Sequence, residues 1–176
     1  QIMENWAMQP EVLKMYAKHY KTGEIIPQEL IDKIDNSRFF NQGFETLEYI
    51  AASLLDMDWH VITDTEEKDV IQFERESITK MGLIQQIWPR YLTTNFIHIA
   101  TWGYESGYYS YLWSAVLDSD AFESFMENGL FDKATAESFR QNILSKGGSE
   151  DPMELYIKFK GRKPMVDALL KKRGLN

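Results

Sequence analysis

The feature that most constrains the fold is a repeated set of helix start and stop signals, with apolar and polar residues alternating over no more than a few positions. The clearest helical run is 44–60, where apolar side chains recur every three or four positions. They are Phe44, Leu47, Ile50, Ala51, Leu54, Leu55 and Trp59. Because this spacing places side chains on one side of an α-helix, we predict a long, largely buried helix here and an all-α fold.

Proline and glycine mark the bounds of further helices, since proline is tolerated in the first turn and glycine favours the end. The predicted helices cover 10–20, a stretch from Pro27, 65–80, 106–117, Ser119 or Asp120 to Gly129, 132–146, a stretch from Asp151, and Pro164 to Gly174. Pro89 should break the chain within the less regular stretch 82–103. The acidic cluster within 64–69 is placed in the first turn of the helix 65–80, where the helix dipole favours negative charge.

The net charge excludes several partner classes. The 176 residues carry a formal charge of −8, and the isoelectric point is about 4.9. Proteins that bind duplex nucleic acid or anionic lipid need a basic face, so we expect neither partner. No apolar run approaches the ~20 residues of a membrane-spanning helix. The absence of cysteine rules out disulfides and thiolate metal sites, and it suits the reducing cytoplasm, where we place the protein.

The most unusual segment runs from Phe96 to Trp113 and contains one histidine, two glycines and four tyrosines. Because glycine destabilises a helix, we predict a mobile loop that leads into a helix. Tyr104, Tyr108 and Tyr111 follow the spacing i, i+4, i+7 of one helical face. Two interpretations stay open: these phenols pack in the core with local partners, or they face a cleft and donate hydrogen bonds to a developing oxyanion.

Other catalytic or metal-binding motifs are absent from the sequence. The three histidines, His19, His60 and His98, belong to no His-Glu-x-x-His or Glu-x-x-His pattern, and their spacing does not bring them together as zinc ligands. There is no phosphate-binding glycine loop, no cysteine nucleophile and no Gly-x-Ser-x-Gly turn. The residues alone therefore identify no complete active site and no metal site.

Several blocks of the chain, taken in order, resemble the C-terminal catalytic region of the thimet-oligopeptidase and peptidyl-dipeptidase family of zinc metallopeptidases. They are Gln1–Trp6 with Pro10–Leu13, Phe44–His60, Pro89–Tyr91, Phe96–Ile99, Gly103–Trp113, Gly147–Ser149, Pro152–Tyr156 and Phe159–Arg162. Together these blocks span nearly the whole chain, which makes them more specific than any single motif. The resemblance implies that 1–176 is a single C-terminal portion of a larger helical, zincin-type catalytic domain, cut just downstream of its metal-binding helices.

The resemblance also assigns roles to individual residues. Tyr104 and Tyr111 match the two active-site tyrosines of the family, and His98 matches its substrate-contacting histidine. Gly103 and Gly107 match part of the glycine-rich loop that binds substrate. The predicted catalytic residues are therefore the two tyrosines and the histidine.

The loop departs from the family pattern at two positions. Trp102 and Glu105 stand where the family usually has small residues, so they add bulk and charge. This departure bears on the flexibility of the loop, on its specificity and on the activity of the protein.

The implied reaction is hydrolysis of short peptides assisted by zinc. Zinc would polarise the scissile carbonyl and activate a water, whose proton passes to the glutamate of an HExxH helix. Tyr111, with Tyr104 as a candidate second donor, would donate to the tetrahedral oxyanion, and His98 would bind substrate or intermediate nearby. The HExxH helix and the third zinc ligand are expected upstream of Gln1, so this fragment alone should bind no catalytic zinc and be inactive.

The expected partners are short peptides and the missing N-terminal part of the same chain, against which a fragment would expose apolar surface. The sequence leaves two alternatives to an active peptidase. One is a helical binding or structural domain without chemistry, and the other is an inactive member of the same family. The sequence also leaves open whether cleavage is internal or releases dipeptides.

Overall fold

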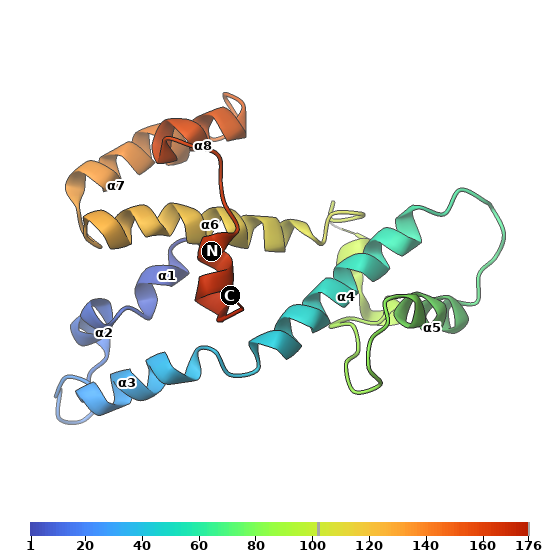
Figure 1. The fold of residues 1–176 in the computed structure, drawn as a ribbon, viewed down its shortest axis with the longest axis horizontal. Coiled ribbons are helices and arrows are strands. Elements are labelled where there is room, and N and C mark those ends of the chain that lie inside the picture. Colours follow the sequence, from blue (N-terminus) through green and yellow to red (C-terminus); the bar gives the residue numbers. More distant parts are fainter. Residues whose placement is uncertain (102, 176) are drawn as a thin grey trace. The chain divides into compact units, whose positions relative to one another are not determined.

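The computed structural model describes residues 1–101 and 103–175 and confirms an all-α fold within them (Figure 1). The only β pairing in these residues is an isolated antiparallel bridge between Lys18 and Ile25. The expectation for Trp102 falls outside the described residues. No helix in the described ranges combines the length and apolar character needed to cross a membrane.

The chain divides into two compact units. The first unit comprises Gln1–Phe40 and Ser114–Asn176, and the second comprises Asn41–Trp113. The first contains α1 Glu4–Ala7, α2 Pro10–Tyr16, α3 Gln28–Ser37, most of α6 Ser110–Asn128, α7 Lys133–Phe139, a π-helical turn Arg140–Leu144, α8 Pro152–Lys160 and α9 Asp167–Arg173. The second contains α4 Gln42–His60, α5 Val70–Lys80, the 3-10 turns Thr93–Asn95 and Ile97–Ile99, and the first residues of α6.

Three predicted helix ends are confirmed by their caps. Asp132 precedes α7 and accepts the Thr135 N–H at 2.7 Å. Asp151 precedes α8 and accepts two backbone N–H groups at 2.9 and 3.0 Å, and Pro152 occupies the first helical position, as expected. Gly174 ends α9 with a left-handed φ of +64°, which glycine adopts without strain.

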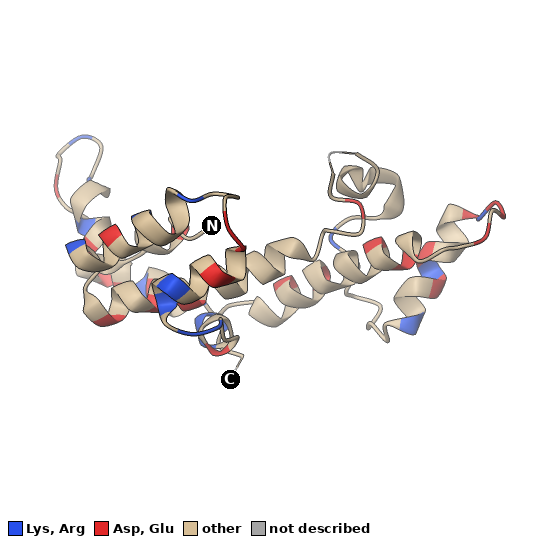
Figure 2. Cartoon of the chain, turned by 90° about the horizontal axis from the view of Figure 1, so that it is seen from above, with Lys and Arg blue, Asp and Glu red and all other residues tan. Residues whose placement is uncertain are grey.

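Several helix bounds predicted from the sequence are wrong, among them the start at Pro164, since α9 begins only at Asp167. α2 ends at Tyr16, because the following residues turn back to form the bridge at Lys18. α5 begins at Val70, where Asp69 accepts the Gln72 N–H at 2.9 Å. The other acidic residues of 64–69 therefore lie in the loop before α5, a stretch in which Figure 2 colours several charged residues, and not in its first turn.

α6 is a single helix, so the helix break predicted at Ser119 or Asp120 is also wrong. Serine and aspartate favour helix caps because their side chains compete for nearby backbone groups. Here Ser119 and Asp120 are buried within the helix, and the Asp120 carboxylate bonds to side chains far along the chain. Distant partners therefore overrode a local signal.

Aromatic side chains form the main core of the first unit. Phe125 on α6, Phe139 on α7 and Phe159 on α8 contact one another at ring-centroid distances of 5.2 to 6.3 Å. Trp6 from α1 packs edge-on against Phe125 at 4.7 Å, and its indole N–H donates to the Leu130 carbonyl at 2.9 Å. Offset and edge-on rings of this kind stabilise a core beyond the area they bury.

A buried polar network ties α6 to the C-terminal part of the first unit. Asp120 is 1% exposed, and its two carboxylate oxygens accept N–H groups of Arg162 at 2.7 and 2.9 Å. The Tyr156 hydroxyl also donates to this carboxylate, at 2.6 Å. Burial alone would raise the pKa of Asp120, but the hydrogen bonds from Arg162 and Tyr156 outweigh it and the pKa lies below its ordinary value. Two of the family-like blocks at the C-terminus thus hold one buried carboxylate.

The lowered pKa predicts that this network loses its effect in acid. A carboxyl whose pKa is lower in the folded than in the unfolded chain stabilises the fold above its unfolded pKa, about 4, and the stabilisation disappears as the pH falls through the folded value. Asp120→Asn should therefore reduce the free energy of unfolding most near neutral pH, and the difference from the native chain should shrink below about pH 4. Urea unfolding across this range measures it.

Asp35→Asn is the matched control, since Asp35 pairs with Arg38 on the surface, where both side chains are more than half exposed. It reports the background effect of the same chemical change. An Asp120→Asn difference that stays constant down to about pH 3 would contradict the assigned role of the carboxylate.

The second unit is built on the packing of α4 against α5. The Trp59 and Phe73 rings lie 4.0 Å apart between centroids, and the Ser77 hydroxyl donates to Asp58 at 2.6 Å. Glu74 is 5% exposed and accepts the Thr93 N–H at 2.7 Å, which holds the first 3-10 turn against α5. These contacts fix the start of the segment that carries the candidate site.

Candidate functional site

His98 lies in the second unit at the centre of a group of aromatic rings. Five rings surround it, with centroids 5.2 to 6.3 Å from that of the imidazole. They belong to Tyr91, Phe96, Tyr104, Tyr108 and Tyr111. We call these six side chains the aromatic cluster. The structure thus brings together all three side chains that the resemblance marks as catalytic.

The cluster is anchored by its two buried members. Phe96 is 1% exposed and Tyr108 is 4% exposed, and both pack against Ala52 of α4. Burial raises the pKa of Tyr108 to about 12. The 3-10 turn that begins directly after Phe96 carries His98, so the anchor also sets the position of the imidazole.

The three evenly spaced tyrosines do not share one environment. Tyr108 is a core residue, which fits the first interpretation, whereas Tyr104 and Tyr111 are half-buried at the edge of that core. α6 begins at Ser110, so Tyr104 and Tyr108 precede the helix and the predicted helical start at residue 106 is wrong. A turn, and not helical spacing, brings Tyr104 to Tyr111.

Tyr104 and Tyr111 are stacked. Their ring centroids lie 5.4 Å apart and the ring planes differ by 6°. The pKa of Tyr111 is raised above its ordinary value. The main cause is a hydrogen bond with the Tyr104 phenol, and burial is the second cause. Because the pKa of tyrosine is already about 10 in water, Tyr111 stays protonated at neutral pH and keeps a proton to donate.

His98 has one ring nitrogen without a partner. Its Nδ1 atom is buried and has no hydrogen-bond partner in the described part of the chain. A buried N–H without an acceptor is costly, so the neutral ring should carry its proton on Nε2. In that tautomer Nε2 is a hydrogen-bond donor, which is the form needed to bind a carbonyl oxygen.

Each of the two predicted substrate-binding glycines has a backbone reason to be glycine. Gly103 has a φ of +74°, a left-handed conformation that other residues adopt only with strain. Gly107 donates its N–H to the Tyr104 carbonyl at 2.8 Å, and a Cβ on Gly107 would lie 3.3 Å from that oxygen. Both glycines therefore shape the turn that presents Tyr104, while their contact with substrate stays a prediction.

Two further residues support the cluster and carried no role in the sequence analysis. The Tyr49 hydroxyl donates to the Tyr108 carbonyl, and the two rings stack at 5.1 Å. Asp56 accepts the N–H groups of Ser106 and Tyr108. One signal for Asp56 was present in the sequence: this carboxylate stands four residues after Ala52, on the buried side of α4.

The described residues do not fit a zinc site. No group of three or more histidine, aspartate or glutamate side chains in them is arranged to hold a metal ion. Glu105 is the only Asp, Glu, Lys or Arg between Arg90 and Asp118 in the sequence, and the Asp56 carboxylate, which α4 brings to the cluster, accepts the backbone amides of Ser106 and Tyr108. What this part of the chain offers is a set of neutral hydrogen-bond donors.

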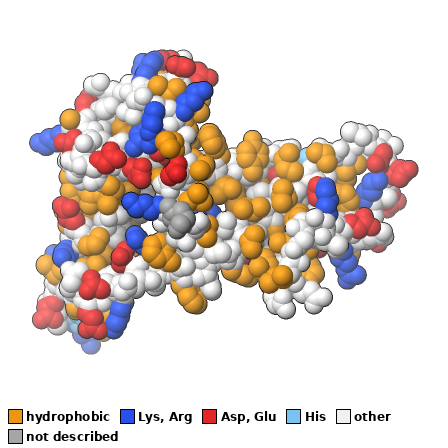
Figure 3. Space-filling view, viewed as in Figure 1, with side chains coloured by type: hydrophobic (Ala, Val, Ile, Leu, Met, Phe, Trp, Pro, Cys, Tyr) orange, Lys and Arg blue, Asp and Glu red, His pale blue; other side chains and the backbone are white. Residues whose placement is uncertain are grey.

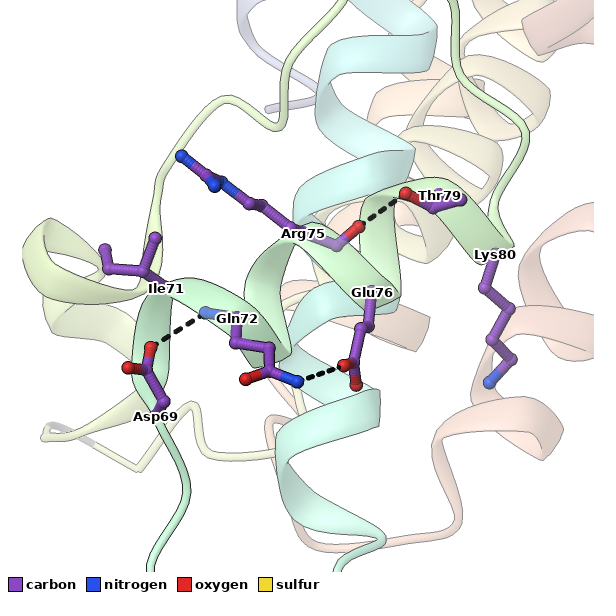
Figure 4. A pocket seen from close by; sticks show the side chains of 7 residues that line it. All are labelled: Asp69, Ile71, Gln72, Arg75, Glu76, Thr79 and Lys80. Carbon is purple, nitrogen blue, oxygen red and sulfur yellow. Dashed lines mark hydrogen bonds between the residues drawn. The ribbon is translucent and has the colours of Figure 1, made fainter.

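An open hollow of about 680 Å³ lies along the outer side of α5, away from any predicted site residue (Figure 4). Its lining consists of Asp69, Ile71, Gln72, Arg75, Glu76, Thr79 and Lys80. The polar groups there bond to one another, with Gln72 donating to Glu76 at 2.8 Å and Thr79 donating to the Arg75 carbonyl at 2.7 Å. This hollow does not contribute to the candidate site.

Comparison with known proteins gives one consistent answer. The sequence model of peptidase family M3 matches residues 1–175. The chain is 40% identical over 178 residues to dipeptidyl carboxypeptidase of Escherichia coli (strain K12), an alignment that covers 100% of this chain and 26% of that protein. It is also 40% identical to oligopeptidase A of the same organism, over 99% of this chain and 26% of that protein. Saccharolysin of Saccharomyces cerevisiae is 29% identical, with 99% and 25% covered.

The chain is all-α, holds a cluster of tyrosines around a histidine, and is matched along nearly its whole length by proteins named as peptidases. The chain belongs to peptidase family M3, as the resemblance predicted. It spans about a quarter of the length of the curated relatives it matches.

Proposed function

We propose that this chain forms one side of the active site of a metallopeptidase that hydrolyses short peptides. The observation that carries the proposal is the meeting of Tyr104, Tyr111 and His98 in the aromatic cluster. The names of the two Escherichia coli relatives support the same reaction, since both names describe peptidases. They include a dipeptidyl carboxypeptidase and an oligopeptidase at equal identity, so the proposal names short peptides as the substrate class and goes no further.

The proposed roles follow from the hydrogen-bonding capacity of each side chain. Tyr111 donates its phenol proton to the oxyanion that forms when the peptide carbonyl becomes tetrahedral, and Tyr104 is the second donor. His98 donates from Nε2–H to a substrate carbonyl beside them. Neutral donors suit this task because they need not lose a proton at neutral pH and can be held in place before the reaction begins.

The zinc of such an enzyme would be held by residues that this chain does not contain. Family M3 peptidases are in general zinc metallopeptidases, and the described residues form no metal-binding group. The short coverage of the relatives supports a division of the active site between this chain and other segments of the same protein. We place that protein in the cytoplasm, in keeping with the absence of cysteine.

An apolar strip on α4 supports this division. Four large apolar side chains of α4 are 37 to 45% exposed: Phe44, Leu47, Leu54 and Met57. Hydrophobic side chains also lie at the visible surface in the region of α4 (Figure 3). We propose that other segments of the peptidase domain cover this strip, because an exposed apolar patch on a folded protein usually marks a contact surface.

The test uses the full-length protein and this chain side by side. The full-length protein should cleave a short internally quenched fluorescent peptide, lose activity with a chelator and recover it with zinc, whereas residues 1–176 alone should neither cleave nor hold stoichiometric zinc. A full-length protein that binds zinc and cleaves no short peptide would favour the inactive family member. Stoichiometric zinc on residues 1–176 alone would contradict the proposed division of the site.

A further inference from the structure

Asp56 is a fully buried carboxylate that the proposed chemistry does not use. It lies on α4 and is 0% exposed. Its Oδ1 atom accepts the Ser106 N–H at 3.0 Å, and its Oδ2 atom accepts the Tyr108 N–H at 2.9 Å. Both amides belong to the turn between Tyr104 and Tyr111, so one side chain of α4 holds the segment that carries the candidate catalytic phenols.

The turn has a conformation that needs such support. Ser106 has a φ of +59°, which is the left-handed region that residues other than glycine seldom adopt. Backbone N–H groups on either side of a left-handed residue point into a concave space that favours an anion, and hydrogen bonds to a carboxylate are stronger than those to a neutral acceptor. The carboxylate of Asp56 fills this space, with His60 Nδ1 as a third neighbour 2.9 Å from Oδ1.

The two hydrogen bonds from the backbone to the Asp56 carboxylate, which we call the Asp56 clamp, act at both ends of the turn. On one side, Gly107 N–H closes the turn on the Tyr104 carbonyl at 2.8 Å, next to the amide that Asp56 holds at Ser106. On the other side, Asp56 holds the Tyr108 amide, which lies two residues before Ser110. Ser110 is the first residue of α6, and α6 carries Tyr111. Fixing these two amides therefore holds the turn that carries Tyr104 against the start of the helix that carries Tyr111.

We propose that Asp56 is a positioning residue of the peptidase site: it holds the turn at 104–108 so that the Tyr104 phenol stays hydrogen-bonded and stacked against Tyr111. This inference rests on the proposed function. Asp56 touches no reacting atom and acts through the backbone amides of the turn.

Asp58 provides a matched control on the same helix. Its carboxylate bonds to side chains of α5 and not to the turn, accepting from Ser77 at 2.6 Å and from Lys80 at 3.2 Å. Asp58→Asn therefore removes a carboxylate from α4 without touching the amides at Ser106 and Tyr108.

The first measurement follows the turn itself in the full-length protein. Asp56→Asn puts an NH₂ group, which cannot accept a hydrogen bond, opposite one of the two backbone amides. Amide hydrogen exchange in the peptide that covers 104–109 should become faster, while Asp58→Asn leaves it unchanged. Unchanged exchange in Asp56→Asn would overturn the clamp, and this result does not depend on whether the protein is a peptidase.

The second measurement tests positioning through kinetics. Asp56→Asn should lower kcat by about 10-fold or more, since small displacements of catalytic groups have effects of this size, and Asp58→Asn should stay within about twofold. In a Tyr104→Phe background, Asp56→Asn should have little further effect on kcat, because the group it positions is already gone. If the kcat losses of Asp56→Asn and Tyr104→Phe simply add in the double variant, Asp56 contributes to general stability and the positioning role is overturned.

Asp56→Glu keeps the inference testable if Asp56→Asn does not fold. It retains the charge but moves the carboxylate by about one bond length, so the protein should fold with a smaller loss of kcat and partly faster exchange at 104–109. If Tyr104→Phe and Tyr111→Phe leave turnover unchanged while the exchange result holds, the proposed function fails and the clamp stands.

Discussion

Tyr111→Phe in the full-length protein should lower kcat by about 10²-fold or more, with KM little changed. The substitution removes only the hydroxyl, and the ring should keep its stacking on Tyr104. The lost hydrogen bond forms mainly in the transition state, so it affects turnover more than substrate binding. Steady-state kinetics with a short quenched peptide measures both constants.

Tyr109→Phe is the matched control for this experiment. Tyr109 is 54% exposed and lies two residues away, outside the aromatic cluster. Its hydroxyl has no assigned role, so kcat should remain near that of the unmodified protein, and the melting temperatures of both variants should be similar. If Tyr111→Phe also stays within about twofold, Tyr111 is not the oxyanion donor.

The second large effect is expected on stability. Arg162→Met should reduce the free energy of unfolding by about 2 kcal/mol, because it leaves the Asp120 carboxylate buried with Tyr156 as its remaining side-chain donor. Breaking a fully buried pair costs more, about 3–5 kcal/mol, but the Arg162 side chain is 38% exposed and solvent already weakens the pair. Urea unfolding at neutral pH gives the value.

Two comparisons isolate the cause of that loss. Arg140→Met removes a similar arginine whose pair with Glu137 lies on the surface, and it should change stability little. Adding Asp120→Asn to Arg162→Met should give a smaller loss than the sum of the two single changes, since no unpaired charge then remains. Strict additivity would show that the two side chains do not act as a unit.

The helices could be predicted from the sequence because their causes are local. The spacing of apolar residues in 44–60, the aspartate caps before α7 and α8, and the glycine after α9 all act within a few residues of one another. One of the wrong predictions has a tertiary cause. At α6, Ser119 and Asp120 are cap-forming residues whose expected local role gives way to burial and to distant partners.

For the candidate site, the residue types were predictable and their arrangement was not. The family-like blocks identified His98, Tyr104 and Tyr111, and the structure brings these three side chains together. The spacing of the tyrosines predicted one helical face, whereas Tyr104 reaches Tyr111 through a turn before the helix. A turn held by contacts outside itself cannot be derived from the residues of the turn.

The sequence by itself determined the all-α class, several helix ends and the family, because these depend on local backbone preferences and on ordered blocks of residues. Only the tertiary structure decided which tyrosine is buried and which carboxylate holds the turn. The physical reason is distance along the chain. Asp56 is 52 residues from the Tyr108 amide that it binds, and Asp120 is 42 residues from Arg162, so each contact exists only after the chain has folded.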